Sequence, residues 1–535
     1  MPGCRRSRSA SGDEPRPAAC RGARWAAVGA AVGYIAVAGV AHAEKWTLSA
    51  SAGATETYNH YSGEGQPSDG FVTSLTAALG FSGDGARLKI NGTVSGTELL
   101  YAGQGQSNTF APSANIAGHL EAIERFFFVD TTANVSQTYL SPFGAQPGNL
   151  TVPTNNRYTS ESYSVSPYIK GVLGSQVAYL VRDDNGWTTS QTFGDSSLKA
   201  PGTYWNNLDA EANSVAGGPA GWSVQYTRQN YDSGAGTGTY ILQLGRAIAS
   251  YRVDPELDLS LRGGYESDRF PQASTIGNST SGGFYGGGLH WRPTERTDLS
   301  GFWEHHFFGS SYSWQLTHRL PNIALSANFA RGLSSFPQLA LAVPAGVPVA
   351  QFLDLAFTTR IPDPVERALA VAQFLAQSGL PPTLVSPLNV YSTAVTLQNT
   401  AALSAVWVGA LNSIGFTLFR SESEAVSGQG STLPPELQFG VNNVQTGGGA
   451  NYSHRLSAFT NLVAGATYTS TRPNSTEVSV ANARTRNLNS FVSLSTQFTP
   501  KTSGSVGVSY FVFDSDSVGG KPSTLSAYAS ISHTF

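Results

Sequence analysis

The stretch STLSAYASISHTF, residues 523–535, decides the fold because its apolar and polar side chains alternate almost one by one. Side chains on a β-strand point to opposite faces in turn. This stretch therefore predicts an amphipathic strand that ends in an aromatic residue. Its apolar face consists of Leu525, Ala527, Ala529, Ile531 and Phe535. Its polar face consists of Ser526, Ser530, Ser532 and Thr534.

The same alternation recurs through the chain, for example over residues 222–227, 257–266 and 505–512. Each of these segments has one apolar and one largely polar face when it is extended. The longest apolar region after residue 43, around Leu339–Phe352, is interrupted by two prolines, so it does not predict a membrane-spanning helix. The pattern predicts an all-β chain.

Composition narrows the class of all-β protein. Charged residues make up 13% of the 535 residues and aromatic residues 11%, whereas soluble proteins contain about 25% charged residues. The mean hydropathy of −0.15 is too low for a bundle of membrane helices. A transmembrane β-barrel combines few charges with ordinary hydropathy, because lipid-facing apolar residues alternate with luminal polar ones. We therefore predict an antiparallel transmembrane β-barrel over residues 44–535.

A secretory signal peptide is expected over residues 1–43. Its apolar core, residues 25–40, follows Arg21 and Arg24 and precedes small residues at the cleavage point, which is the order of a Sec signal. The alternative is a single membrane anchor, but an apolar core of about 16 residues is shorter than the roughly 20 that a spanning helix needs. The predicted cleavage signal comprises Ala41, Ala43 and Glu44.

Cys4, Cys20 and Met1 are the only Cys and Met residues of the whole sequence. Removal of residues 1–43 would therefore leave a chain without sulfur. Disulfides, cysteine nucleophiles and thiolate metal sites are then excluded. The segment also holds six of the 32 basic residues but only two of the 35 acidic ones, so the remainder is more acidic than the formal net charge of −3 for the whole chain. This balance argues against nucleic acid as a partner.

Short and long connections alternate along the chain, which is the asymmetry of bacterial outer-membrane barrels. Counting strands on this rule, from Lys45 to the last stretch, gives about 22 strands, within a range of 20–24. The short turns are residues 251–255, 291–294, 318–321, 454–457 and 498–501. The longer connections, rich in Gly, Ser and Asn, include residues 232–238, 267–281, 423–437 and 471–483.

The last strand resembles the signal that the barrel assembly machinery of the outer membrane reads. The residues that carry this match are Leu525, Ile531 and the terminal Phe535, whereas His533 stands where an apolar residue is usual. The match predicts a protein of the outer membrane of a Gram-negative bacterium, with the lipid bilayer and the assembly machinery as partners.

Residues 334–392 break the alternation. Asp363 stands as an N-cap, a proline opens the first turn, and Glu366 follows three residues after the cap, which together predict a helix that runs to Gly379. A shorter helix is expected over residues 349–357. The insert follows the fifteenth strand on the predicted external side, where it either folds into the lumen, as we favour, or caps the rim. The candidate constriction or lid residues are Asp363, Glu366, Arg367, Leu369 and Leu375.

Several stretches resemble the outer-membrane family associated with PEP-CTERM/exosortase systems. The carriers are Ser141–Ala145 (SPFGA), Tyr163–Tyr168 (YSVSPY), Gly171–Gly174 (GVLG), the helix at Asp363–Gly379 and the terminal Phe535. The resemblance covers most of the chain after residue 43. It implies an outer-membrane barrel in a bacterium that exports exopolysaccharide, with export components as partners, and it implies no enzymatic reaction.

No catalytic, cofactor-binding or metal site is predicted. Glu304-His305-His306 is the densest group of possible ligands, but adjacent strand residues face opposite sides, so only Glu304 and His306 converge. Two ligands are fewer than a zinc site needs, and histidines of an aromatic rim explain the group better. The Trp residues belong either to interfacial girdles, as we favour, or to luminal sugar-stacking sites. They are Trp46, Trp187, Trp222, Trp291, Trp303 and Trp314.

Three functions remain open. The leading hypothesis is a pore or conduit for polysaccharide or another polar polymer, since a wide barrel encloses water unless something fills it. The first alternative is a structural or assembly component of the envelope export machinery. The second is a barrel hydrolase, although no spacing marks a Ser/His/acid or paired-carboxylate site. A TonB-dependent transporter is disfavoured, because alternation begins near Lys45 and leaves no room for a plug domain ahead of the strands.

Overall fold

The structure is a computed structural model that describes residues 43–535 apart from several gaps. Residues 1–42, and with them Ala41 and nearly all of the predicted signal peptide, lie outside the described residues, while Ala43 and Glu44 open the first strand. The gaps are residues 64, 104, 195–199, 216, 233–237, 271–279, 336–346, 359, 379–382, 390–393, 427–439, 475–482 and 518–519.

Two helices and a series of long strands make up the described chain. The strands up to the insert are β1 (Ala43–Ser62), β2 (Gly70–Gly85), β3 (Leu88–Ala102), β4 (Thr109–Ile123), β5 (Phe127–Tyr139), β6 (Arg157–Leu173), β7 (Val177–Thr192), β8 (Thr203–Ser214), β9 (Ala220–Asp232), β10 (Thr239–Asp254), β11 (Leu257–Ser267), β12 (Ser281–Thr294), β13 (Thr297–His306), β14 (Gly309–Leu320) and β15 (Ile323–Ser334). The insert contains β16 (Val347–Pro348), α3 (Val349–Phe357), α4 (Pro364–Ser378) and β17 (Thr383–Leu384). The remaining strands are β18 (Thr396–Val408), β19 (Asn412–Ala425), β20 (Asn443–Arg455), β21 (Thr460–Pro473), β22 (Thr485–Thr499), β23 (Thr502–Ser515) and β24 (Ser523–Thr534).

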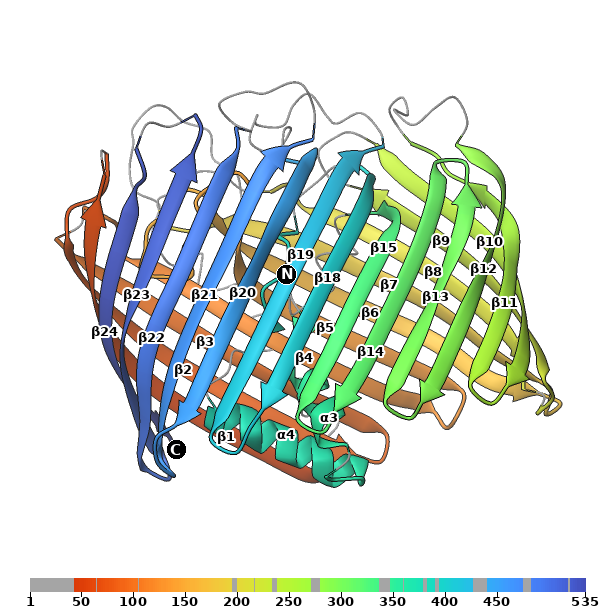
Figure 1. Cartoon of the computed structure of the whole chain (residues 1–535), viewed down its shortest axis with the longest axis horizontal. Coiled ribbons are helices and arrows are strands. Elements are labelled where there is room, and N and C mark those ends of the chain that lie inside the picture. The colour runs from red at the N-terminus through yellow and green to blue at the C-terminus, as the bar shows by residue number, and fades with distance from the viewer. Residues whose placement is uncertain are drawn as a thin grey trace, which may run out of the picture.

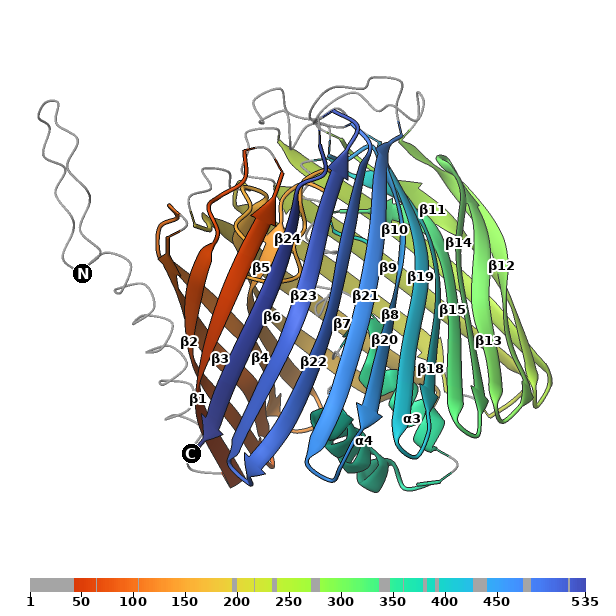
Figure 2. The same ribbon diagram turned by 60° about the vertical axis from the view of Figure 1, so that its left-hand side comes forward.

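The long strands form one closed antiparallel β-barrel of 22 strands. Each strand pairs with the next along the chain, and β15 pairs with β18 because β16 and β17 form a separate small ladder. The barrel closes where β1 pairs with β24, from Ser51↔Thr534 to Ser62↔Ser523. Figures 1 and 2 show this continuous wall. The predicted fold class and strand number are confirmed.

Alternation distributes the side chains between the two faces of the wall. In β11, Leu259, Leu261 and Tyr265 point outward and are 44%, 74% and 60% exposed, whereas Arg262 and Glu266 point inward. The same rule holds around the barrel, so large apolar side chains cover the outer surface. An outward apolar belt of this kind is what a barrel presents to the acyl chains of a bilayer.

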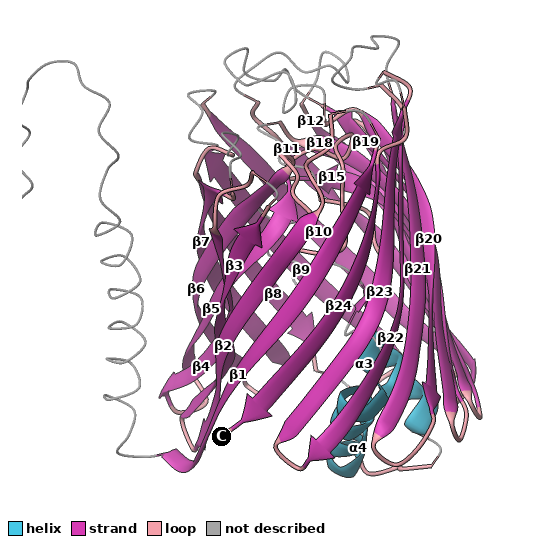
Figure 3. Ribbon diagram, turned by 90° about the vertical axis from the view of Figure 1, so that its left-hand side faces the viewer, coloured by secondary structure: helices cyan, strands magenta, loops and turns pink. Residues whose placement is uncertain are grey.

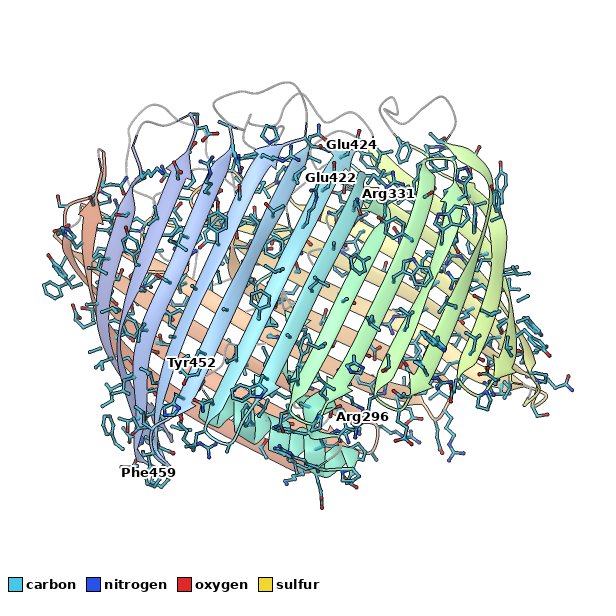
Figure 4. The ribbon with its side chains drawn as sticks, viewed as in Figure 1. Arg296, Arg331, Glu422, Glu424, Tyr452 and Phe459 are labelled. Carbon is cyan, nitrogen blue, oxygen red and sulfur yellow. The ribbon has the colours of Figure 1, made fainter. Side chains whose placement is uncertain are left out.

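The outer surface is not uniform along the barrel axis. Figure 4 shows Arg331, Glu422 and Glu424 toward one end of the wall and Arg296, Tyr452 and Phe459 toward the other. Charged and aromatic residues at the borders of the apolar belt fit the two interfaces of a membrane.

Short turns gather at one end of the barrel, as the sequence predicted. Tight turns join β10 to β11, β12 to β13 and β14 to β15, and further short turns join β20 to β21 and β22 to β23. We call this the short-turn end and the opposite one the long-loop end. The first strand, β1, begins at the short-turn end, and the last strand, β24, ends there (Figure 1).

The last strand adopts the predicted amphipathic arrangement. Leu525, Ile531 and Phe535 are 48%, 54% and 69% exposed, while Ser526 is buried on the lumen side. The backbone N–H of Phe535 donates a hydrogen bond to the carbonyl of Ala50 in β1, which extends the closing pair to the terminal residue. Recognition of this strand by the assembly machinery stays a prediction.

Both predicted helices are present in the insert between β15 and β18. α3 covers Val349–Phe357, and α4 begins at Pro364, directly after the predicted cap. The predicted stop at Gly379 lies outside the described residues. Within the described chain, no helix is both long and apolar enough to cross a membrane.

Candidate functional site

The α3–α4 insert lies against the inner wall of the barrel at the short-turn end (Figures 1 and 3). α3 packs on β14, β15 and β18. Phe352 and Leu353 are buried in one apolar cluster with Ala324 of β15 and Val406 of β18. Because Leu325, next to Ala324, points outward and is 38% exposed, this cluster lies on the lumen side of the wall. The helices therefore occupy part of the lumen.

The helices lie in the lumen, which is the favoured expectation for the insert, but at the end opposite to its attachment. The insert is attached at the long-loop end, where Ser334 pairs with Thr396. Its helices lie at the opposite end, where the Arg360 guanidinium donates a hydrogen bond to the Asn322 side chain in the turn between β14 and β15. The apolar lumen-side patch that contains Ala324 explains this placement, since it buries the apolar face of α3.

The five candidate lid residues divide into three groups. Asp363 caps α4, because its Oδ1 accepts the backbone N–H of Glu366 at 2.9 Å, and Arg367 links the two helices by donating from Nε to Asp354 Oδ1 at 2.7 Å. Leu375 packs on the buried cluster. Glu366 and Leu369 form the third group, since their side chains are exposed, as is that of the capping Asp363.

A second segment enters the lumen from the long-loop end. This inward loop, residues 140–156, connects β5 to β6 and reaches across to β22. Asn489 Oδ1 accepts the N–H of Gly148 at 2.7 Å, and its Nδ2 donates to the Gln146 carbonyl at 3.0 Å. Asn487 makes a parallel pair of bonds, with the N–H of Gln146 and the carbonyl of Gly144. The loop is thus tied to a wall segment more than 300 residues later in the chain.

Arg157 stabilises the inward loop from within. Its side chain is only 3% exposed and donates to the backbone carbonyls of four loop residues and to the Tyr139 hydroxyl. The carbonyls of Pro147 and Asn149 also accept from the Tyr139 hydroxyl and the Val152 N–H. The carbonyls of Leu150 and Val152 therefore depend most on the guanidinium, and a buried acceptor that loses its donor is costly. The four carbonyls belong to Pro147, Asn149, Leu150 and Val152. The inward loop therefore has a defined structure, held by hydrogen bonds, inside the lumen.

The inward loop contains Ser141–Ala145, one of the stretches that carry the family resemblance. Ser141 and Phe143 are buried, and the Asn156 side chain accepts the N–H of Ser141 and donates to its carbonyl. A Cβ at Gly144 would lie 2.4 Å from the Asn156 carboxamide. This compact turn needs glycine at that position, and it gives the stretch a structural role in folding the loop.

A charged cluster lies on the lumen side of β10, β11 and β13. The Glu304 carboxylate is fully buried and accepts hydrogen bonds from Arg246 at 2.8 Å and Arg262 at 3.2 Å. Arg262 lies over the ring of Phe302, 4.2 Å from its centroid. Two arginines on one carboxylate satisfy its oxygens, and this pairing offsets the desolvation of the buried charge.

His306 extends the charged cluster toward the long-loop end. Its Nδ1 lies 2.9 Å from Glu266 Oε2 and its Nε2 lies 3.1 Å from Glu304 Oε2. A doubly protonated imidazole satisfies both carboxylates, since each ring nitrogen then donates. The ring stacks between Phe284 and Phe308, with centroids 4.6 and 4.9 Å away. The predicted convergence of Glu304 and His306 is confirmed.

His305 behaves as the alternation predicted. It points outward, is exposed, and stacks near Tyr285 and Trp303 on the lipid-facing surface. The rim interpretation therefore holds for His305 and is wrong for His306, which belongs to the luminal ion pairs. The difference arises because Arg246 and Arg262 come from other strands, whose register the sequence alone does not give.

Asp268, just beyond the end of β11, borders the same cluster. Burial and the nearby charge of Glu266 raise the pKa of its carboxyl to about 7, although the N–H of Gln243, which donates to Asp268, opposes the shift. A buried acid whose pKa lies near neutrality changes charge over a physiological range. Asp268 thus makes the charge of this luminal wall depend on pH.

Gly286 of β12 makes room for the buried carboxylate. A Cβ built on it would lie 2.1 Å from the Trp303 carbonyl oxygen and 2.8 Å from Cγ of Glu304. No side chain fits at that distance. The glycine is therefore required for Glu304 to lie flat against the wall beneath the two arginines.

A smaller ion-pair group lies on the lumen side of β4 to β7. Asp130 accepts from Arg182 Nη1 at 2.7 Å and lies 2.7 Å from His119 Nδ1, and Arg182 Nε also donates to Asp184 at 2.7 Å. The luminal wall thus carries fixed charges on two sides, and these make the lumen polar.

The predicted ligand types do not assemble into a metal centre in the described part of the chain, where no group of three or more His, Cys, Asp or Glu is arranged to hold an ion. Of the singled-out tryptophans, five are 39–44% exposed on the outer surface, as girdle residues would be. They are Trp46, Trp187, Trp222, Trp291 and Trp303. Trp205, which the sequence did not single out, instead packs near Tyr231 and Tyr240 inside the barrel.

Comparisons with known proteins give only distant structural matches. No protein-family profile matches the chain, and no curated protein matches it. Among solved structures, the FrpB iron transporter from Neisseria meningitidis (F5-1 variant) aligns over 90% of this chain and 82% of its own, with 8% identity and a TM-score of 0.46. The siderophore receptor PirA from Acinetobacter baumannii aligns over 92% and 81%, with 9% identity and a TM-score of 0.43. PirA from Pseudomonas aeruginosa aligns over 91% and 80%, with 10% identity and a TM-score of 0.35.

Proposed function

We propose that this protein is an outer-membrane conduit for polar solutes, and that two segments folded into the lumen determine which solutes pass. The observation that carries the proposal is the hydrogen-bonded attachment of the inward loop to Asn487 and Asn489, combined with the burial of α3 on the opposite rim of the lumen. Barrels of 16 to 18 strands already leave an aqueous channel, so about 22 strands leave ample room for a partly filled one.

The proposed location rests on the outer surface of the barrel. A closed wall without free strand edges satisfies the backbone inside lipid, and the exposed apolar belt matches the acyl chains. In this proposal the protein reaches the outer membrane of a Gram-negative bacterium through its signal peptide. The barrel assembly machinery inserts it by reading the strand that ends at Phe535.

The finer proposal concerns the solute. The resemblance to the PEP-CTERM/exosortase-associated family supports exopolysaccharide as the transported polymer, with export components as partners. In this view the barrel catalyses no reaction. The main competing role is a structural component of the export machinery, in which the luminal segments close the barrel permanently.

Liposome swelling separates the conduit from the structural role. Proteoliposomes that contain the full chain are placed in isotonic solutions of sugars of increasing size, and empty liposomes and heat-unfolded protein serve as controls. The conduit predicts swelling rates that fall with sugar size. Proteoliposomes that swell no faster than empty ones with every sugar, although the barrel is folded, would favour the structural role.

A further inference from the structure

The inward loop encloses a recess between itself and the barrel wall. This recess has a volume of about 610 Å³, and loop residues Gly148–Val152 form one side of it. The other side consists of residues of β1, β2, β3 and β21 to β24. Its volume lies within the range of small-molecule binding sites, about 300–1,000 Å³. The recess is therefore large enough for a ligand of several rings. The hydrogen bonds from Asn489 to the inward loop hold that side of the recess in place.

Two aromatic side chains of the wall, Phe491 and Tyr528, line the recess. A Cβ on Gly465 would lie 2.5 Å from Cε1 of Phe491, and one on Gly507 would lie 2.7 Å from Cζ of Tyr528. Each ring therefore occupies the space that a side chain on the neighbouring strand would fill. A flat apolar surface of a ligand in the recess can stack on these rings.

The rest of the lining combines apolar residues, such as Leu99, Leu150 and Phe511, with polar residues that carry no charge. None of the described residues that line the recess is Asp, Glu, Lys or Arg. The polar groups are carboxamides, such as those of Asn149 and Asn489, and hydroxyls, such as the Thr76 and Thr97 pair, whose oxygens are 2.9 Å apart. Hydroxyl and carboxamide groups both donate and accept hydrogen bonds. They suit a ligand whose rim carries many hydroxyls.

A lining of this kind selects a chemical class. An anionic ligand finds no cation in the recess to offset its desolvation, and a purely apolar ligand leaves the hydroxyls and carboxamides without partners. A pyranose ring has an apolar face made of C–H groups and a rim of hydroxyls. It can stack on Tyr528 or Phe491 and hydrogen-bond to the surrounding polar groups at the same time.

We infer that this recess is a binding site for an uncharged saccharide, held by stacking on Phe491 and Tyr528. The inference deepens the proposed function, on which it rests for the access of the saccharide to the lumen. It narrows the solute to neutral sugars and places their contact beneath the inward loop, on the wall opposite the charged cluster of Arg246, Arg262 and Glu304.

Isothermal titration calorimetry on the detergent-solubilised full chain tests this site without requiring conduction. Maltohexaose serves as the neutral probe, an oligogalacturonate of similar length as the charged probe, and polyethylene glycol of similar size as a probe without the hydroxyl rim. Tyr528→Ala is expected to weaken maltohexaose binding about tenfold or more, as loss of a stacking surface does. Tyr528→Phe keeps the ring and is expected to retain most of the affinity.

The matched control is Tyr285→Ala, which removes a tyrosine of the outer surface that is 62% exposed, and it is expected to leave saccharide binding unchanged. A second variant, Phe491→Leu, removes the other ring, and retention of the heat-modifiable folded band on gels confirms that each variant is folded. Saturable maltohexaose binding that Tyr528→Ala and Phe491→Leu weaken supports the site. Equal binding of the charged probe or of polyethylene glycol, or folded protein that binds no maltohexaose, overturns it. If swelling still occurs in that case, the conduit stands and only the saccharide site fails.

Discussion

The Asn489 side chain on β22 accepts the backbone N–H of Gly148 at 2.7 Å, although the two residues are 341 positions apart in the chain. This bond fixes the inward loop to a strand on another part of the wall. It converts a loop between β5 and β6 into a crossing segment of the lumen. The arrangement of the lumen therefore depends on a contact that no local part of the sequence specifies.

Asn489→Ala is expected to release the inward loop. The variant removes both hydrogen bonds to the loop and leaves an N–H and a carbonyl without their partner, a loss of about 1–3 kcal/mol. Limited proteolysis should cleave the loop faster in the variant than in the wild type. The matched control is Asn328→Ala, which removes an inward asparagine whose side chain donates to the nearby Ser326 hydroxyl. Equal cleavage of the loop in wild type and Asn489→Ala would contradict the role of Asn489 in holding the loop against the wall.

Arg157→Lys is expected to destabilise the inward loop further, although it keeps the positive charge. A lysine ammonium has three donors on one atom, whereas the guanidinium of Arg157 reaches five acceptors. Carbonyls left without a donor cost about 3 kcal/mol in total. Urea unfolding in detergent and loop proteolysis measure the two effects. A variant as stable and as protease-resistant as the wild type would show that the charge alone is what the loop needs.

Glu304→Gln is expected to destabilise the barrel wall more than any exposed substitution. The change leaves Arg246, Arg262 and His306 facing each other without the central carboxylate, and breaking a buried ion pair costs about 3–5 kcal/mol. The midpoint of heat-modifiable gel mobility reports this loss. Glu256→Gln, in the exposed turn between β10 and β11, is the control and should leave the midpoint unchanged.

Asp268 is expected to make stability fall as the pH rises. Its pKa is about 7 in the folded protein, against an ordinary value of 3.8, so its contribution is fully present below pH 3.8 and is lost as the pH rises through 7. The contribution of Asp268 to the free energy of unfolding is at most about 4 kcal/mol. Glu266 and His306 also face this group, so the difference between wild type and Asp268→Asn isolates it. A difference that stays constant from pH 4 to pH 8 would contradict the raised pKa.

The sequence predicted the barrel because each strand can be recognised from its own alternation of apolar and polar residues. The alternation of Leu259 and Leu261 with Asp258 and Ser260 identifies a strand without any neighbour, and short turns such as Arg292-Pro293-Thr294 mark where other strands end. For the same reason α4 was predicted from the local pattern at Asp363. These elements depend on interactions within a few residues.

The luminal features could not be predicted because they depend on pairs distant in sequence. Arg246 and Arg262 meet Glu304 only once the register of four strands is set. The inward loop shows no periodic pattern, and its attachment to Asn489 carries no local signal. The insert was recognised as helical, yet its position at the short-turn end depends on the apolar patch at Ala324, which is identifiable only in the folded barrel.

Single-channel recording in planar bilayers tests the conduit most directly. The wild type is compared with a variant in which a short Gly-Ser linker joins Ser335 to Ala394 in place of the insert, and with Leu353→Asp, which places a charge at the fully buried centre of the α3 contact. We expect ion conductance for the wild type and a higher conductance for both variants, because the helices occupy part of the lumen. Silent bilayers for all three folded proteins would contradict the proposed conduit.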